Sequence, residues 1–439
     1  MLVAAGYAAA CGIVLALGFD HISDDDFARV TIAQGFAHAP RLDPSGTSWL
    51  PFPFWALGSV MLVLGRSLAV ARGASIAMAS LAAVLPYLAL RRSGVTRGRG
   101  LASVGFAMLS PWSVWLGAAT VPEAMVASLT AAAAIGLGAG AGAGRIGFAA
   151  VMLAACLSRY EAWPVAAVLA VVLGRRAWKE RSAGSLACVA LVAVGPLLWI
   201  AWNAYAHQDG LHFFARVSRF KRAIGEGSVD TARALLLYPR LLVTTRPDVI
   251  LAVVCAAVAV WKLLASQGAD RSVLRARWGV PLACAGAQIA FLACANARDG
   301  APAHHAERAL LGATFILAAF AADVLVAAAP LGWSRARAPT IGVAALLLSV
   351  WAFTTLRALG DPPGSGPTED RAPQLARGRA LRSDGAAELV ITPCAYEHFA
   401  LIAAYGAPEH VETRAATGAG AGAPRGEPFS ATCPAVERR

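Results

Sequence analysis

The sequence predicts an all-α polytopic integral membrane protein. We expect about eleven transmembrane helices, further segments lying at the outer membrane surface, and a small C-terminal α/β region outside the membrane. Three observations support this prediction. Of the 439 residues 58% are hydrophobic, the mean hydropathy is +0.59, and only 15% are charged, whereas soluble chains carry about a quarter charged residues. A water-soluble fold of this composition would lack the polar residues needed to cover its surface.

Eleven apolar runs are candidate membrane spans, judged against the roughly 20 residues that a helix needs to cross the hydrocarbon core. The first run lacks a basic leader and a small-residue cleavage site, so we expect a retained helix. The fifth and sixth are short enough to be tilted or partly re-entrant. The candidate spans are residues 2–19, 68–90, 101–119, 124–144, 146–158, 163–174, 184–203, 248–264, 279–295, 309–329 and 340–356.

The basic residues indicate the orientation of these spans. The formal charge is +12, but Lys and Arg lie mostly between apolar runs, which is a topology signal and argues against a nucleic-acid partner. With the N-terminus inside, the basic clusters all fall on the cytoplasmic side, provided that the proline-interrupted apolar segment 49–64 lies at the outer surface without crossing. The clusters lie at residues 91–99, 175–181, 262–277 and 335–337.

Two domains follow from this arrangement. Residues 1–357 form the membrane domain, with a first outer loop at 20–67 and a long outer loop at 204–247, where alternating aromatic and basic residues at 209–222 predict an amphipathic segment at the lipid headgroups. Residues 358–439 form the C-terminal region outside the membrane. It begins with a linker at 361–367, continues with a strand at 387–392, and includes low-complexity coil at 418–424 and two cysteines, Cys394 and Cys433, that could pair.

Three consecutive carboxylates, Asp24, Asp25 and Asp26, follow the first span in the motif FDHISDDDF. Because like charges repel, such a run at a membrane face needs a reason. One interpretation is a solvated helix cap, with Ser23 or Asp24 as the N-cap. The other is a general base aimed at an acceptor hydroxyl or amine, with a neighbouring carboxylate that could hold Mg²⁺ or Mn²⁺. Both interpretations stay open at this point.

A fourth acid, Glu123, lies in a short outer turn after Pro122. A glutamate in the first turn of a helix is its simple structural explanation. The predicted orientation, however, places Glu123 on the same face of the membrane as the Asp run. We therefore treat Asp24, Asp25, Asp26 and Glu123 as candidate catalytic acids, with Asp24, Asp25 and Glu123 as the candidate ligands of a metal whose presence the sequence does not determine.

The motif SRYEAW places Arg159, Tyr160 and Glu161 between two short apolar runs. Charged groups near bilayer depth are functional candidates, although a mutually neutralising structural pair is the competing explanation.

The motif HHAER places His304, His305 and Arg308 at the outer end of a late span. Arg308 could bind an anionic phosphate with help from a histidine, or simply extend to the membrane surface.

In combination and order, these motifs resemble the GT-C superfamily of membrane glycosyltransferases over residues 15–330. SDDDFARVTIAQGF, followed by TSWLPFPFWALGSVMLVLGRSLAVARGASI, is similar to the first loop of bacterial members akin to the protein mannosyltransferases and the lipid A aminoarabinose transferase, where an Arg opens the next helix. Arg72 would be that residue. TVPEAMVASL, LSRYEAWPV and HHAERALLGATF are similar to later motifs of such proteins.

The resemblance implies an activity. Such enzymes transfer a sugar from a polyprenyl-phosphate carrier to a lipid, glycan or protein acceptor on the non-cytoplasmic face, which implies a bacterial inner-membrane protein with a periplasmic active site. Asp24 or Asp25 would activate the acceptor, with inversion at the anomeric carbon, and Arg159 or Arg308 would stabilise the departing phosphate. Arg72, Tyr160, Glu161, His304 and His305 would belong to the same substrate site. The chain lacks the Glu-Lys pair of the aminoarabinose transferase and a WWD motif, so neither that donor nor oligosaccharide transfer is implied.

Two other classes remain open from the residues alone. A polytopic transporter or lipid flippase without transferase activity would place ionisable groups in broken helices near the midplane. The short runs around Arg159 and Glu161 are the feature that favours it. A membrane scaffold would leave the Asp run unexplained.

Overall fold

The computed structural model is predominantly helical. It describes residues 1–139, 144–223, 230–265, 271–302, 305–332, 337–364, 366, 369–393, 395–414 and 435–438. His304, Cys394, Cys433 and the predicted coil at 418–424 lie outside these residues.

A helix occupies each of the eleven predicted spans, one of them as two helices. Four helices are long and apolar enough to cross a membrane, or up to six if each of two bent helix pairs counts as one span, among the residues described. The expected number of about eleven crossings is therefore not confirmed. The helices are α1 (Leu2–Ala16), α4 (Leu68–Arg92), α5 (Arg97–Met108), α6 (Pro111–Ala118), α7 (Glu123–Gly138), α8 (Arg145–Cys156), α9 (Trp163–Glu180), α10 (Ala183–His207), α13 (Pro247–Ala265), α14 (Arg271–Asn296), α15 (Leu311–Gly332) and α16 (Arg337–Leu359).

The predicted span 101–119 is wrong as a single helix. It consists of α5 and α6, which are bent by 77° relative to each other. Pro111 has no backbone N–H and cannot continue α5, and the Ser110 hydroxyl accepts a hydrogen bond from the Ser113 N–H at the new helix start. A second bend, of 89°, separates α12 (Thr231–Thr245) from α13.

Helix α7 lies at the centre of the helical bundle, because every one of its residues is buried. Its small side chains let neighbouring helices approach closely, as is common in lipid. At Gly136 an added Cβ would lie 2.5 Å from the Phe148 ring of α8.

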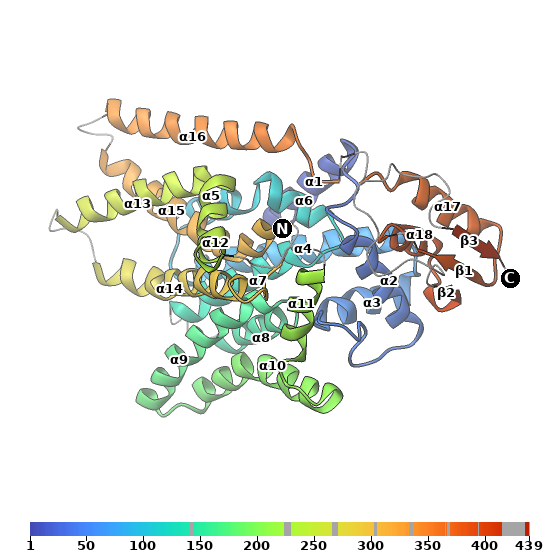
Figure 1. Cartoon of the computed structure of the whole chain (residues 1–439). Coiled ribbons are helices and arrows are strands. Elements are labelled where there is room, and N and C mark those ends of the chain that lie inside the picture. The colour runs from blue at the N-terminus through green and yellow to red at the C-terminus, as the bar shows by residue number, and fades with distance from the viewer. Residues whose placement is uncertain are drawn as a thin grey trace.

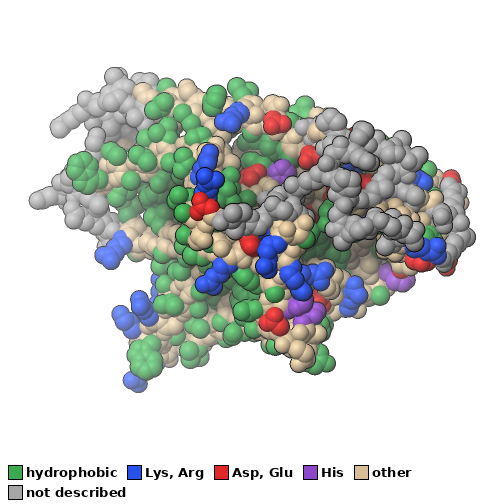
Figure 2. Space-filling model, in the orientation of Figure 1, with side chains coloured by type: hydrophobic (Ala, Val, Ile, Leu, Met, Phe, Trp, Pro, Cys, Tyr) green, Lys and Arg blue, Asp and Glu red, His purple; other side chains and the backbone are tan. Residues whose placement is uncertain are grey.

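Large hydrophobic side chains cover the outside of the bundle. Leu81, Trp178, Leu197 and Leu348 are all exposed, and hydrophobic side chains spread over the helical part of the face in Figure 2. Such a surface suits a lipid environment and not water. The chain is therefore an integral membrane protein.

The two loops predicted to lie on the outer side both contain helices. The first contains α2 (Asp25–His38) and α3 (Phe52–Leu64), which pack against each other. The second contains α11 (His212–Ala223) and α12, of which only α11 was expected as an ordered segment. In α11, Phe213 is buried while Arg216, Arg219 and Arg222 are exposed, as an amphipathic helix requires.

The C-terminal region is a small α/β unit, as predicted. A three-stranded sheet has the order β2-β1-β3, with β1 (Leu389–Thr392) parallel to β2 (Val411–Thr413) and antiparallel to β3 (Ala435–Arg438). Helices α17 (Ala372–Ser383) and α18 (His398–Tyr405) complete it. The unit lies beside α2 and α3 (Figure 1), and its apolar side chains share one core with those two helices.

Candidate functional site

Three acids and two arginines from four distant segments of the chain meet in one cluster. Arg308 Nη2 donates to Asp25 Oδ2 at 2.8 Å, and Arg308 Nε lies 3.6 Å from Glu123 Oε1. Arg159 Nη1 donates to the same Glu123 oxygen at 2.6 Å, while Arg159 Nε donates to Glu161 at 3.1 Å. The acids and arginines that the sequence placed on one side of the membrane therefore lie in direct contact.

Local structure explains why these side chains converge. Asp25 and Glu123 are the first residues of α2 and α7, where a carboxylate is favoured by the helix dipole. Arg159 is extended, with φ −153°, between α8 and the short 3₁₀ helix η1 (Tyr160–Ala162). Arg308 lies in a second 3₁₀ helix, η2 (Ala306–Leu310), which precedes α15. Each of these four side chains is thus positioned at or near the end of a helix, and the packed bundle holds those helix ends in place.

Sequence reasoning missed a third arginine of the cluster, Arg29. Its side chain is buried, and its guanidinium lies 4.4 Å from the centroid of the Trp49 ring and 5.8 Å from that of Phe54. Burial lowers the pKa of Arg29 to about 10, against the opposing charges of Glu123 and Asp25. Its spacing of four residues from Asp25, which puts both on one face of α2, was the signal available in the sequence.

The cluster is balanced in charge, with Arg29, Arg159 and Arg308 against Asp25, Glu123 and Glu161. Burial on its own would raise the pKa of Asp25, but the positive charges of Arg308 and Arg29 outweigh it and lower that pKa below its usual value. Asp25 is therefore a carboxylate at neutral pH. It gains basicity only if the arginines beside it are neutralised by another anion.

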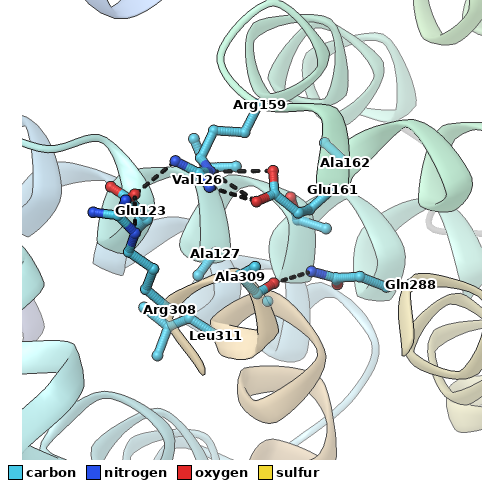
Figure 3. A pocket seen from close by; sticks show the side chains of 12 residues that line it. Glu123, Val126, Ala127, Arg159, Glu161, Ala162, Gln288, Arg308, Ala309 and Leu311 are labelled. Carbon is cyan, nitrogen blue, oxygen red and sulfur yellow. Dashed lines mark hydrogen bonds and ion pairs between the residues drawn. The ribbon is translucent and has the colours of Figure 1, made fainter. Parts of the chain in front are cut away.

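A small cavity opens within the cluster (Figure 3). Its charged side is lined by Glu123, Arg159, Glu161 and Arg308, and another part of its wall by Gln288. Four buried atoms of the lining residues have no hydrogen-bond partner among the described residues: Glu123 Oε2, Gln288 Oε1, and Arg308 Nε and Nη1. An unpaired buried polar atom is costly, so this set suits a ligand that offers both acceptor oxygens and hydroxyl donors.

The three consecutive aspartates have three different partners. Asp24 is bound by Arg371 of the C-terminal unit, Asp25 by Arg308, and Asp26 by the backbone. Asp24 occupies the N-cap position of α2, as one interpretation expected, but its side chain makes no cap hydrogen bond and binds Arg371 instead.

Asp26 faces the protein interior, with an exposed fraction of 2%. Its carboxylate accepts hydrogen bonds from the N–H groups of Ile22, Ser23 and Thr120 at 3.1 to 3.2 Å. Burial raises the pKa of Asp26, while His21 and these donors act in the opposite direction. Through these hydrogen bonds the Asp26 carboxylate links the first loop to the turn that precedes Glu123.

The structure places the remaining predicted site residues away from these ion pairs. Arg72 binds the Asp20 carboxylate. The Tyr160 hydroxyl donates to the Ser48 carbonyl at 2.6 Å and accepts from Trp199 at 2.9 Å, so it ties the first loop to α10. His305 contacts the Trp112 ring at a centroid distance of 5.6 Å.

The three acids considered as metal ligands each bind a different arginine: Asp24 binds Arg371, Asp25 binds Arg308 and Glu123 binds Arg159. In the part of the chain that the structure describes, no group of three or more His, Cys, Asp and Glu side chains is arranged to hold a metal ion.

One solved structure aligns with most of the chain. The crystal structure of ArnT from Cupriavidus metallidurans bound to undecaprenyl phosphate aligns with 92% of this chain and 75% of its own, at 13% sequence identity and a TM-score of 0.47. No protein-family model and no curated protein matches the sequence. A likeness at this level leaves the chemistry to be argued from the residues of this chain.

Proposed function

We propose that the chain is an integral membrane glycosyltransferase that moves a sugar from a polyprenyl-phosphate donor to an acceptor on the non-cytoplasmic face. The observation that carries this proposal is the cluster of Asp25, Glu123, Arg159 and Arg308, assembled from four distant segments beside a cavity with unpaired polar atoms. The order of sequence motifs that resembles the GT-C superfamily is consistent with it. Arginines suit a phosphate group, because their forked donors match its oxygens.

The reaction would proceed by direct displacement. The acceptor's hydroxyl or amine attacks the anomeric carbon, a new bond to that carbon forms, and the bond from the carbon to the phosphate oxygen breaks. The acceptor's proton passes to the Asp25 carboxylate, and the polyprenyl phosphate leaves with the bonding electrons. Attack from the side opposite the leaving group inverts the anomeric centre. Arg308 and Arg159 would stabilise the charge that develops on the departing phosphate.

The ion pair between Asp25 and Arg308 suggests how donor binding would prepare the base. While Arg308 binds Asp25, the carboxylate is a weak proton acceptor. A phosphate that engages Arg308 would neutralise part of that positive charge, and the pKa of Asp25 would rise. Asp25 would thus become an effective base only when a donor is present, which would limit unproductive chemistry at the empty site.

A lipid flippase is the second candidate, because two helix pairs are sharply bent. At the second bend, Arg246 Nε and Nη2 donate to the two oxygens of Asp248, both at 2.9 Å, and both residues are buried. Buried charges at broken helices are typical of transporters. Here, however, the two charges mainly neutralise each other.

The test is transfer of labelled sugar from a polyprenyl-phosphate donor in membranes that contain the protein. We expect Asp25→Asn to lower the rate by about 10² to 10⁴-fold, the usual contribution of a general base, and Glu123→Gln also to lower it strongly. Asp361→Asn, which changes an exposed acid in the linker, serves as the control and should retain activity. Unchanged transfer by Asp25→Asn would refute the assignment of the base, and lipid translocation by the wild type without any transfer would favour the flippase.

A further inference from the structure

Arg371 of the C-terminal unit binds the first aspartate of the run in a forked geometry. Its Nε donates to Asp24 Oδ1 at 2.7 Å and its Nη2 donates to Asp24 Oδ2 at 2.9 Å. The Arg371 side chain is 10% exposed and that of Asp24 is 21% exposed. A two-bond guanidinium–carboxylate pair fixes orientation as well as distance, and partial burial protects it from solvent screening.

The rest of the interface shows that this ion pair is one end of a larger contact. Further along α2, Gln34 Nε2 donates to the Ala403 carbonyl of α18 at 2.8 Å and to the Arg66 carbonyl at 2.9 Å. Arg66 Nη1 donates to both Glu409 carboxylate oxygens at 2.7 Å. Between these polar contacts, apolar side chains of α2, α3, α17 and α18 form a common core, which includes Phe27, Val30, Ala33, Leu57, Met61, Leu375, Ala400 and Ala403.

Helix α2 therefore lies between the acid–arginine cluster on one side and the C-terminal unit on the other. Asp25 and Arg29 face the cluster, whereas Asp24, Phe27 and Gln34 contact the C-terminal unit or its core. Three adjacent carboxylates at the start of a helix repel one another. Arg371 neutralises the first of them at the point where the helix begins.

We infer that Arg371 is a positioning residue that fixes the first turn of α2 by binding Asp24, and so places Asp25 against Arg308, an inference that rests on the transferase function proposed above. Asp24 then serves as the anchor for Arg371, and Asp25 is the aspartate that meets the substrate. The C-terminal unit becomes a structural part of the active site, although none of its side chains lines the cavity among the described residues.

The experiment compares Arg371→Gln, Arg371→Lys, Asp24→Asn and the double variant Arg371→Gln/Asp24→Asn in the full chain, reconstituted in lipid nanodiscs. Amide hydrogen exchange of residues 25–30 reports the order of the first turn of α2, and transfer kinetics report kcat and KM for the donor. We expect faster exchange in Arg371→Gln and a fall in kcat of about 10 to 100-fold, because small displacements of a catalytic group have effects of that order. Arg371→Lys should recover part of both.

The double variant should be no more impaired than either single variant, because all three lack the same ion pair. Arg66→Gln is the matched control. It breaks another ion pair of the same interface, which lies beside Gln34 and not beside the first turn of α2, so exchange should increase near Glu409 while kcat stays within about twofold.

Two results would overturn the inference. One is unchanged exchange and unchanged kcat in Arg371→Gln. The other is a loss of kcat in Asp24→Asn far beyond that of Arg371→Gln, which would make Asp24 itself the group that meets the substrate. Hydrogen exchange can be measured whether or not sugar is transferred. A wild-type protein without transfer activity would therefore refute the proposed function, while the exchange data alone would still decide whether Arg371 orders α2.

Discussion

The Asp25 carboxylate accepts a hydrogen bond of 2.8 Å from the Arg308 guanidinium, across 283 positions of sequence. This contact joins the first residue of α2 to η2, the 3₁₀ helix that precedes α15. It also brings the acid proposed as the base within reach of the cation proposed to bind phosphate. Several consequences can be measured.

Two substitutions of Arg308 should distinguish the effect of its positive charge from the effect of its forked hydrogen-bond geometry. Arg308→Gln removes the positive charge between Asp25 and Glu123, and we expect transfer to fall by about 10² to 10³-fold, as for loss of a group that stabilises transition-state charge. Arg308→Lys keeps the charge but cannot reach both acids in the forked geometry, so it should recover only part of the rate. Arg298→Gln, at an exposed arginine, is the control in the same kinetic assay. Activity within twofold of wild type in Arg308→Gln would contradict this role.

Asp26→Asn should reduce stability. The Asp26 carboxylate accepts from three backbone N–H groups. Whichever way the Asn amide turns, its NH₂ faces at least one of these donors, and the buried donor loses its partner. We expect a cost of about 1 to 3 kcal/mol, measured as a lower free energy of unfolding in detergent. Asp361→Asn is the neutral comparison, and equal stability of the two variants would refute the structural role of Asp26.

The contact between Asp20 and Arg72 predicts a pH dependence. Burial on its own would raise the pKa of Asp20, but His21 and Arg72 outweigh it and lower the pKa from 3.8 to about 2. Because the folded-state pKa is depressed, Asp20 contributes its stabilisation fully above 3.8 and loses it as the pH falls toward 2. The wild type should therefore lose stability more steeply than Asp20→Asn in that range, as followed by thermal unfolding at stepped pH. Parallel curves for the two proteins would rule this out.

Gly136 offers a test of packing inside the bundle. A Cβ at this position would lie 2.5 Å from the buried Phe148 ring, whereas a Cβ at Gly147, in α8, would meet nothing within 4 Å. Gly136→Ala should cost about 1 to 3 kcal/mol through overpacking. Gly147→Ala should be neutral or stabilising by up to about 1 kcal/mol, because alanine favours the helix. The melting temperatures of the two variants are compared in one detergent. An unchanged melting temperature in Gly136→Ala would mean that α7 and α8 can move apart without loss of stability.

The sequence predicted where the apolar helices lie, because long apolar runs seldom form any other stable structure, but the number of membrane crossings was not confirmed. The predicted orientation placed Asp25, Glu123, Arg159 and Arg308 on one side of the membrane, and the structure brings these four side chains together. The sequence did not predict the break at Pro111, because a proline near the middle of an apolar run can also be accommodated as a kink.

The partners of individual charges were beyond sequence reasoning. The spacing of Arg29 from Asp25 indicates a shared helix face, but only the structure shows that the Trp49 and Phe54 rings lie against its guanidinium. Arg371 lies 347 positions after Asp24, in a segment that hydropathy separates from the membrane domain. Contacts between residues so far apart in sequence depend on how the helices pack together. The spacing of residues in the sequence does not determine that packing.

The position of α2 also bears on biosynthesis. Its apolar face, with Phe27, Val30 and Ala33, is covered in part by α17 and α18, which are synthesised after all the apolar helices of the bundle. During translation that part of the face stays uncovered until α17 and α18 have been made and lie on the same side of the membrane as α2. Ribosome-stalled or truncated chains that end before Ala372 should therefore expose α2 to proteases and to chaperones, even when every membrane helix has already been inserted.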